Sequence, residues 1–241
     1  MEEADHEGQE GGAQEGGARP TGGEEEHEAA LSAAAWALLA VAAALAVGDW
    51  VAVALANTSL EYVCKPAVMA ALIGVAVTLD PAQAGRRDWF VVALVLSMLG
   101  DVFLMLPRDM FVAGLTSFLL AHLAYVVGFR VHGGSAAAWG VAAAAVLAID
   151  VVLARPVLSA VRRRHRELLV PVVVYVVVIS TMVSAALATG IGLAIAGAVL
   201  FFASDTLIAW NRFVAPRPWM RLAIIVTYHL GQGGLVLSLA R

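Results

Sequence analysis

The sequence predicts an all-α, polytopic integral membrane protein with eight transmembrane helices. Of its 241 residues, 61% are hydrophobic and only 14% are charged, whereas an ordinary soluble domain is about a quarter charged. Apolar stretches of about 20 residues, the length that crosses a bilayer, recur along the chain. The period-two alternation of a membrane β-barrel is absent from the sequence. These observations exclude a soluble globule. The abundance of Ala, Val, Gly and Arg is typical of a GC-rich genome. We expect a bacterial cell membrane, with an organellar membrane as the alternative.

The charge of the chain divides it into two parts. Residues 1–29 form an acidic, Gly/Glu-rich tail, in which ten acids face the single base Arg19. Such a segment has too little apolar surface to offset the entropy of ordering, so we expect it to be disordered. It has no apolar core near its start and is not a signal peptide. Residues 30–241 are expected to form the transmembrane domain.

The first four predicted helices are separated by short polar or helix-breaking segments. In chain order, the helices are expected at 30–48, 60–79, 89–106 and 109–131. The breaks are Gly48–Asp49, Asp80–Pro81 with Arg86–Arg87, Pro107–Arg108–Asp109 and Gly133–Gly134. Gly, Pro and Asp are frequent in turns, which supports each of these boundaries.

The second four predicted helices follow the same pattern. They are expected at 136–154, 168–189, 191–210 and 219–239. A basic run at 162–166 follows the first of them. Thr189–Gly190 separates the next two, and Pro216–Arg217–Pro218 precedes the last.

The distribution of arginine and lysine predicts an orientation. Nine arginines flank the loops after the first, third, fifth and seventh helices, against five on the other side. Because positively charged loops stay in the cytoplasm, we expect these loops inside and both termini outside.

Among the ionisable residues within predicted spans, four stand out: Lys65, Asp101, Asp205 and His229. Each costs roughly 2.5–3.5 kcal/mol to insert, which makes it a candidate functional residue. Lys65, Asp101 and Asp205 are each expected about 8 Å below the same membrane face, from a rise of ~1.5 Å per residue. The shared depth predicts one polar cavity. The alternatives are that Lys65 extends to the lipid headgroups or that it pairs with the aspartates for structure alone.

Further polar residues accompany these charges. The candidates for substrate contact are His122, Tyr125, Ser204, Asn211, Tyr228 and Gln232. Glu61 and Lys65 are also spaced i,i+4, as in a helical ion pair. The single cysteine excludes a CxxC metal site, no Gly-rich phosphate loop follows a strand, and no basic stripe is present. We therefore expect no metal, no cofactor and no nucleic-acid partner.

A faint internal repeat accompanies this pattern. Gly100–Asp101 is echoed by Ser204–Asp205, and Glu61…Pro66 is echoed by Glu167…Pro171. The spacing predicts two parallel halves of four helices each.

Several motifs together give the chain a family resemblance. They are Lys65–Pro66, the segments 97–107 (SMLGDVFLMLP), 111–114 (FVAG) and 118–125 (FLLAHLAY), then 201–205 (FFASD), 211–213 (NRF) and 228–232 (YHLGQ). In combination they resemble the YhhN-like family, which includes the lysoplasmalogenases. The resemblance covers the second to eighth predicted helices.

The resemblance implies a membrane hydrolase that acts on a lysophospholipid. The reaction cleaves the vinyl-ether bond of lysoplasmenylethanolamine or lysoplasmenylcholine to a fatty aldehyde and the glycerophospho-ethanolamine or -choline. Protonation of the vinyl ether needs a neutral acid, and a carboxyl group in an apolar site keeps its proton more readily than one in water. We expect Asp101 and Asp205 to be the acid/base pair, with the two roles unassigned. Lys65 is expected to bind the phosphate, and the remaining candidates, which include His122, Tyr125, Gln232 and His229, to contact substrate or water.

Three other functions fit the same residues. Buried Asp, Lys and His residues also suit a proton-coupled transporter of a small molecule or lipid. Two membrane aspartates occur in intramembrane proteases, although the first glycine of the GxGD signature is missing before Asp101. A non-catalytic lipid-binding protein is the third. Substrate headgroup and oligomeric state are left open by the sequence.

Overall fold

A computed structural model describes residues 32–79, 83–133 and 135–240. The predicted acidic tail lies outside these residues. In the described part, eight helices are long and apolar enough to cross a membrane, and no strand occurs. In chain order they are α1 (Ala33–Ala54), α2 (Thr58–Thr78), α3 (Ala84–Met105), α4 (Phe111–His132), α5 (Ala136–Arg164), α6 (Leu169–Thr189), α7 (Gly192–Phe213) and α8 (Pro218–Leu237). The predicted fold class, a multi-pass helical membrane protein, is confirmed.

Local sequence signals set several helix ends. The side chains of Ser32, Asn57 and Ser135 accept hydrogen bonds from backbone N–H groups in the first turns of α1, α2 and α5. These bonds satisfy donors that a helix start leaves free. Gly190 ends α6 with a φ of 71°, in the left-handed region that favours glycine.

Two helices are longer than the sequence predicts. α1 continues past Gly48 to Ala54, because Asp49 is buried within the helix instead of marking its end. α5 continues past Pro156 to Arg164, because Val157 and Val161 extend its buried face by another two turns. The other predicted bounds lie within five residues of those observed.

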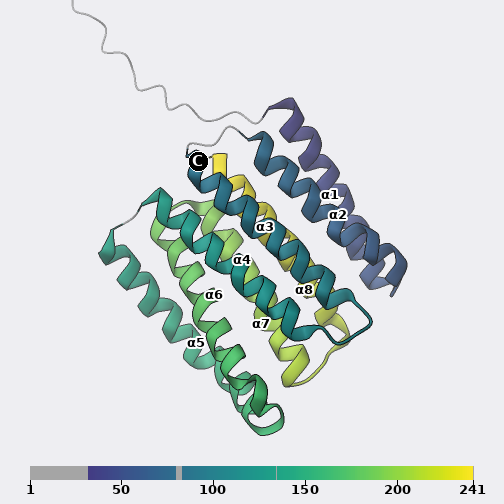
Figure 1. Cartoon of the computed structure of the whole chain (residues 1–241), viewed down its shortest axis with the longest axis vertical. Helices are drawn as coiled ribbons and strands as arrows, with labels where there is room; N and C mark the ends of the chain where they lie inside the picture. The colour runs from purple at the N-terminus through teal and green to yellow at the C-terminus, as the bar shows by residue number, and fades with distance from the viewer. Residues whose placement is uncertain (1–31, 80–82, 134, 241) are drawn as a thin grey trace, which may run out of the picture.

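The helices form antiparallel hairpins that pack into one bundle. Consecutive helices pair as α1 with α2, α3 with α4, α5 with α6 and α7 with α8. α8 also packs against α1 and α2, and α6 against α4. In Figure 1, α5 lies at one edge of the bundle and α1 at the opposite edge, with α3, α4, α7 and α8 between them.

Aromatic rings fill the centre of the bundle. The ring centroids of Phe118 in α4 and Phe201 in α7 are 6.1 Å apart, and both rings lie edge-on to Tyr228 in α8, at 5.9 and 5.4 Å. Gly100 in α3 makes room for this layer, since a Cβ there would lie 2.7 Å from the Phe118 ring.

The backbones of α7 and α8 approach each other unusually closely. A Cβ at Gly197 would lie 2.6 Å from the backbone nitrogen of Leu235, and one at Gly231 would lie 2.9 Å from that of Phe201. Only glycine fits at such a contact, as in other membrane helix pairs. The contact fixes α7 and α8 relative to each other, and with them the side chains of Asp205 and Tyr228.

Arg86 corrects the sequence interpretation, which counted it as a loop charge. It lies in the first turn of α3 and is 2% exposed. Its guanidinium donates to the Ser238 hydroxyl at 2.9 Å and lies over the rings of Phe90 and Phe129 at 5.2 and 5.8 Å. The predicted orientation of the termini remains a prediction.

Candidate active site

The two membrane aspartates belong to separate hydrogen-bond clusters. Asp205 in α7 contacts His122 in α4 and Tyr175 in α6. Asp101 in α3 contacts Lys65 in α2 and Tyr228 in α8. We call these the Asp205 cluster and the Asp101 cluster. The rings of Phe118 and Phe201 pack between them.

The Asp205 cluster converges on one carboxylate oxygen. The Tyr175 hydroxyl donates to Asp205 Oδ2 at 2.5 Å, and His122 Nε2 lies 3.1 Å from the same oxygen. His122 is fully buried, and its Nδ1 has no hydrogen-bond partner among the described residues. In the tautomer with the proton on Nε2, the imidazole donates to Asp205 Oδ2. Both contacts use Oδ2, which leaves Oδ1 for another partner.

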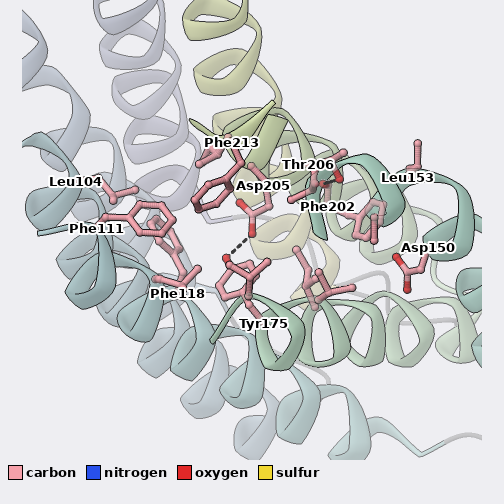
Figure 2. A pocket seen from close by; sticks show the side chains of 18 residues that line it. Leu104, Phe111, Phe118, Asp150, Leu153, Tyr175, Phe202, Asp205, Thr206 and Phe213 are labelled. Atoms are coloured by element: carbon pink, nitrogen blue, oxygen red, sulfur yellow. Dashed lines mark hydrogen bonds between the residues drawn. The ribbon is translucent and has the colours of Figure 1, made fainter. Parts of the chain in front are cut away.

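An apolar cavity of about 80 Å³ lies against Asp205. Its walls come mainly from α4, α5, α6 and α7, and include Phe111, Phe118, Leu153, Tyr175, Phe202 and Phe213. Figure 2 shows the Asp205 carboxylate and the Tyr175 hydroxyl meeting among these side chains. The combination places the Asp205 carboxyl group beside an apolar space, which Asp150 lines from the side of α5.

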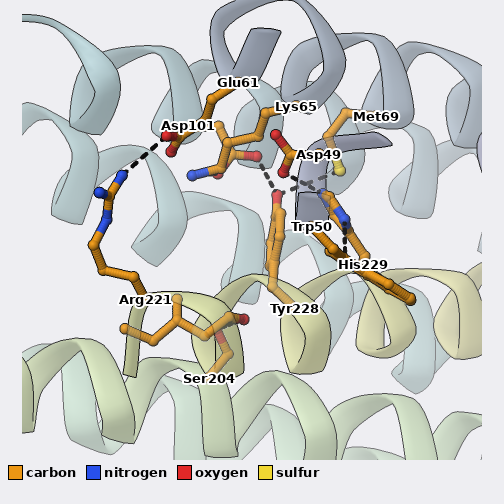
Figure 3. Close-up of polar contacts among 11 residues, drawn as sticks. Asp49, Trp50, Glu61, Lys65, Met69, Asp101, Ser204, Arg221, Tyr228 and His229 are labelled. Carbon is orange, nitrogen blue, oxygen red and sulfur yellow. Dashed lines mark hydrogen bonds and ion pairs between the residues drawn. The ribbon is translucent and has the colours of Figure 1, made fainter. Parts of the chain in front are cut away.

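The Asp101 cluster contains a positive charge, the ammonium group of Lys65, beside the carboxylate. Lys65 Nζ lies 3.4 Å from Asp101 Oδ1, and the Tyr228 hydroxyl donates to Oδ2 at 2.6 Å, as Figure 3 shows. Asp101 is 2% exposed. Lys65 and Asp101 therefore meet at one level, as their predicted depths indicated. Asp101 is absent from the residues that line the cavity beside Asp205.

Glu61 does not make the ion pair that its spacing from Lys65 suggested. Its carboxylate lies 2.9 Å from the guanidinium of Arg221 in α8. Among the described residues, Lys65 therefore forms an ion pair with Asp101 only.

A third buried cluster joins α1 to α8. His229 Nδ1 accepts a hydrogen bond from Trp50 Nε1 at 3.2 Å, and its Nε2 lies 3.9 Å from Asp49 Oδ2. Asp49 is fully buried, and neither of its carboxylate oxygens has a hydrogen-bond partner among the described residues. Figure 3 shows this cluster beside Lys65 and Tyr228. The sequence interpretation missed Asp49 because it treated Gly48–Asp49 as a break, although apolar residues continue on both sides.

The remaining predicted site residues have different surroundings. Tyr125 in α4 donates to Gln232 Oε1 in α8 at 2.6 Å, and both are fully buried. Ser204 donates to the backbone carbonyl of Ile224 at 3.0 Å, a contact that joins α7 to α8. Asn211 accepts from the backbone N–H of Arg217 and so caps the α7–α8 turn, away from all three clusters. Sequence reasoning left Tyr175 out of the candidate site, because one tyrosine in a valine-rich helix resembles ordinary packing.

Charge at the membrane surface is paired near the cavity. The Arg212 guanidinium lies 2.6 Å from Asp109 Oδ2 in the α3–α4 loop. This hydrogen bond and the positive charge of Arg212 hold the pKa of Asp109 below its usual value. Arg212 also lies 4.8 Å over the ring of Phe111, which lines the cavity.

Comparisons with known proteins identify relatives. Residues 60–239 match the YhhN family. The chain is 37% identical over 150 residues to lysoplasmalogenase TMEM86B of Homo sapiens, which covers 62% of each chain. It is 37% identical over 153 residues to the lysoplasmalogenase of Mycobacterium bovis, covering 61% of this chain and 58% of that one. These alignments span about three fifths of the length of each of these two relatives. No solved structure matches the chain significantly.

Proposed function

The chain belongs to the YhhN family, and from that membership and the cavity beside Asp205 we propose that it is a lysoplasmalogenase. Its substrate would be a lysoplasmalogen, a single-chain phospholipid with a vinyl ether at the glycerol. The products would be a fatty aldehyde and a glycerophospho-ethanolamine or -choline. The observation that carries the proposal is that the Asp205 carboxyl group, 9% exposed, lines an apolar cavity of the transmembrane domain.

The reaction starts with a proton transfer to carbon. The acid protonates the β-carbon of the vinyl ether, and the electron pair of the double bond forms the new C–H bond. The oxocarbenium ion that results adds water at the carbon bonded to oxygen. Loss of a proton gives a hemiacetal, which collapses to the aldehyde and the glycerol hydroxyl. General acid–base catalysis of this kind contributes about 10²–10⁴ in rate.

Asp205 is the proposed acid. It lines the apolar cavity, where the vinyl-ether end of the alkenyl chain would lie, and its Oδ1 is not used by Tyr175 or His122. After it gives up its proton, the carboxylate faces the cation that it has formed. Tyr175 and His122 then stabilise the negative charge on Oδ2 by hydrogen bonding.

Asp101 is the proposed second member of the acid/base pair. Lys65 supplies a counter-charge for a carboxylate at 3.4 Å, so this residue suits the anionic role of base. We propose that Lys65, 14% exposed in its side chain, also binds the lipid phosphate. Tyr125, Gln232, Ser204, Asn211, Tyr228 and His229 remain candidates for substrate or water contact.

The test is product analysis by mass spectrometry on purified protein in detergent. Wild-type protein with lysoplasmenylethanolamine should release fatty aldehyde, and the saturated alkyl-ether analogue should give none. In D₂O the aldehyde should carry deuterium on the carbon next to the carbonyl, which reports protonation at carbon. Asp205→Asn should lower the release about 10³-fold, and Asp109→Asn is the matched control because it removes an exposed carboxylate in a loop. Folded protein that releases no aldehyde would contradict the proposal.

The Asp49–His229 cluster favours a second function, proton-coupled transport. Asp49 and His229 are buried and titratable, and the hydrolysis proposed above assigns no role to Asp49. Groups of this kind inside a membrane mark proton pathways. Substrate uptake into sealed proteoliposomes, driven by a pH gradient and without release of aldehyde, would support transport over hydrolysis.

A further inference from the structure

A groove of about 580 Å³ runs along the outside of the bundle between α5 and α6. Its walls are mostly apolar, and Leu147, Val151, Val173 and Val177 are exposed in it. α5 lies at the edge of the bundle, where it packs against α6 and α7. The groove therefore faces the hydrocarbon of the bilayer.

The groove and the cavity beside Asp205 share a wall. Three residues, Asp150, Ala154 and Val176, line both spaces. In Figure 2, Asp150 appears on the opposite side of the cavity from Phe111. One layer of side chains thus separates the bilayer from the chamber that contains Asp205.

A polar contact lies at this shared wall. The Ser180 hydroxyl lies 2.5 Å from Asp150 Oδ2 and 2.6 Å from the backbone carbonyl of Val176. A carboxyl group beside a lipid-facing groove is costly, and such residues in membrane helices usually have a function. Arg155, on the exposed surface of the same groove, adds a positive charge near it.

The dimensions and chemistry of the groove suit a single-chain phospholipid. One hydrocarbon chain fits along a channel between two helices, and Arg155 matches the negative phosphate. Asp205 is 9% exposed in its side chain, so a substrate dissolved in the bilayer needs a route through the bundle wall to reach it. Ala154 lines both spaces, so a route at this residue would connect the groove with the cavity.

We propose that the α5–α6 groove is the lateral access site for a lysophospholipid, and that the Asp150–Ser180 contact closes it from the Asp205 cavity. The inference rests on the proposed function, since it names the path by which that substrate arrives. The chain of the lipid passes between Asp150 and Ala154 on α5 and Val176 on α6.

Photo-crosslinking tests the binding part without hydrolysis. The probe is a saturated 1-O-alkyl lysophosphoethanolamine with a diazirine in its chain, added to wild-type protein in phosphatidylcholine nanodiscs. We expect labelling of peptides from α5 and α6, reduced at least fivefold by excess unlabelled lysophospholipid. Equal labelling of the exposed face of α1, without competition, would overturn the access site.

A matched pair of substitutions tests the route. Ala154→Phe fills the shared wall, whereas Ala148→Phe adds the same ring to an exposed position of α5 outside both spaces. Ala154→Phe should keep the label in the groove, lose the label on cavity residues Phe202 and Thr206, and lower kcat/KM at least tenfold. Ala148→Phe should match wild type. Size-exclusion chromatography and thermal unfolding check that both variants fold.

The outcomes separate the inference from the proposed function. Competed labelling of the groove without any aldehyde release leaves the access site standing and contradicts the lysoplasmalogenase assignment. Aldehyde release by folded Ala154→Phe at the wild-type rate overturns the access route and leaves the assignment standing.

Discussion

Asp205 and Asp101 are alike in local structure and differ in what surrounds them. Each lies on a transmembrane helix and accepts a hydrogen bond from a tyrosine, Tyr175 in one case and Tyr228 in the other. Asp101 meets the ammonium group of Lys65, whereas Asp205 meets the imidazole of His122 and an apolar cavity. The comparison teaches that two aspartates with the same tyrosine contact differ through their other neighbours, a cation at Asp101 and an apolar cavity at Asp205.

The largest loss of hydrolysis rate is expected for Asp205→Asn, at the cavity. Asp205→Asn keeps the size of the side chain and a hydrogen-bond acceptor, but removes the transferable proton. We expect aldehyde release to fall about 10³-fold, within the range of general acid catalysis. The rate is measured by mass spectrometry on protein whose folding is verified by thermal unfolding. A rate within tenfold of wild type would remove the contrast between the two aspartates.

A smaller loss of activity with a larger loss of stability is expected at Asp101. Asp101→Asn leaves Lys65 buried without its counter-charge, and breaking a buried pair costs about 3–5 kcal/mol. We expect about a 10²-fold lower rate, because Asp101 does not line the cavity. The melting temperature should fall further than in Asp205→Asn.

A double variant sharpens this result. Lys65→Met with Asp101→Leu replaces the pair by apolar groups and should recover most of the stability, since such replacements are often neutral. Recovery of activity as well would show that the Asp101 cluster serves the fold alone.

The two tyrosines that donate to the aspartates, Tyr175 and Tyr228, should differ in their effect on the hydrolysis rate. Tyr175→Phe removes a donor to Asp205 Oδ2 and should slow hydrolysis about tenfold, because one hydrogen bond to a charged group contributes about 1.5–3 kcal/mol. Tyr228→Phe removes the matching donor to Asp101 and should slow it less than threefold. Steady-state rates of the two variants, measured side by side, decide the ranking, and a reversed order would place the chemistry at Asp101.

The smallest effect is expected at the exposed pair of Asp109 and Arg212. The pKa of Asp109 lies below its usual value in the folded protein, so the pair's contribution to stability is present above the ordinary pKa of aspartate, about 4, and is lost as the pH falls through the lowered value. Between pH 5 and 8 the pair stays charged. Asp109→Asn should therefore change the hydrolysis rate less than twofold across this range. A pH-dependent loss there would contradict the assignment of Asp109 to the surface.

The sequence was sufficient for the helices and for part of the site. Apolar runs of bilayer length predicted all eight spans, and depth counted along the helices brought Lys65 to Asp101. The partners of Asp205 could not be predicted, because they depend on how α4 and α6 are rotated about their axes. Asp49 was missed for a related reason, since a charged residue flanked by apolar ones reads equally as a break or as a buried group.

The helices differ in stiffness. α7 and α8 pack closely against each other, whereas α5 contains an internal proline. Gly197 and Gly231 bring the backbones of α7 and α8 together, so that the two helices resist bending as one unit. Pro156 in α5 has no N–H to donate to the carbonyl of Val152, so the helix lacks one backbone hydrogen bond in the turn that contains Ala154. This missing bond adds mechanical compliance to α5 at the wall that faces the lipid. The fold thus holds Asp205 on a rigid helix pair and places a more flexible helix, α5, at the edge of the bundle.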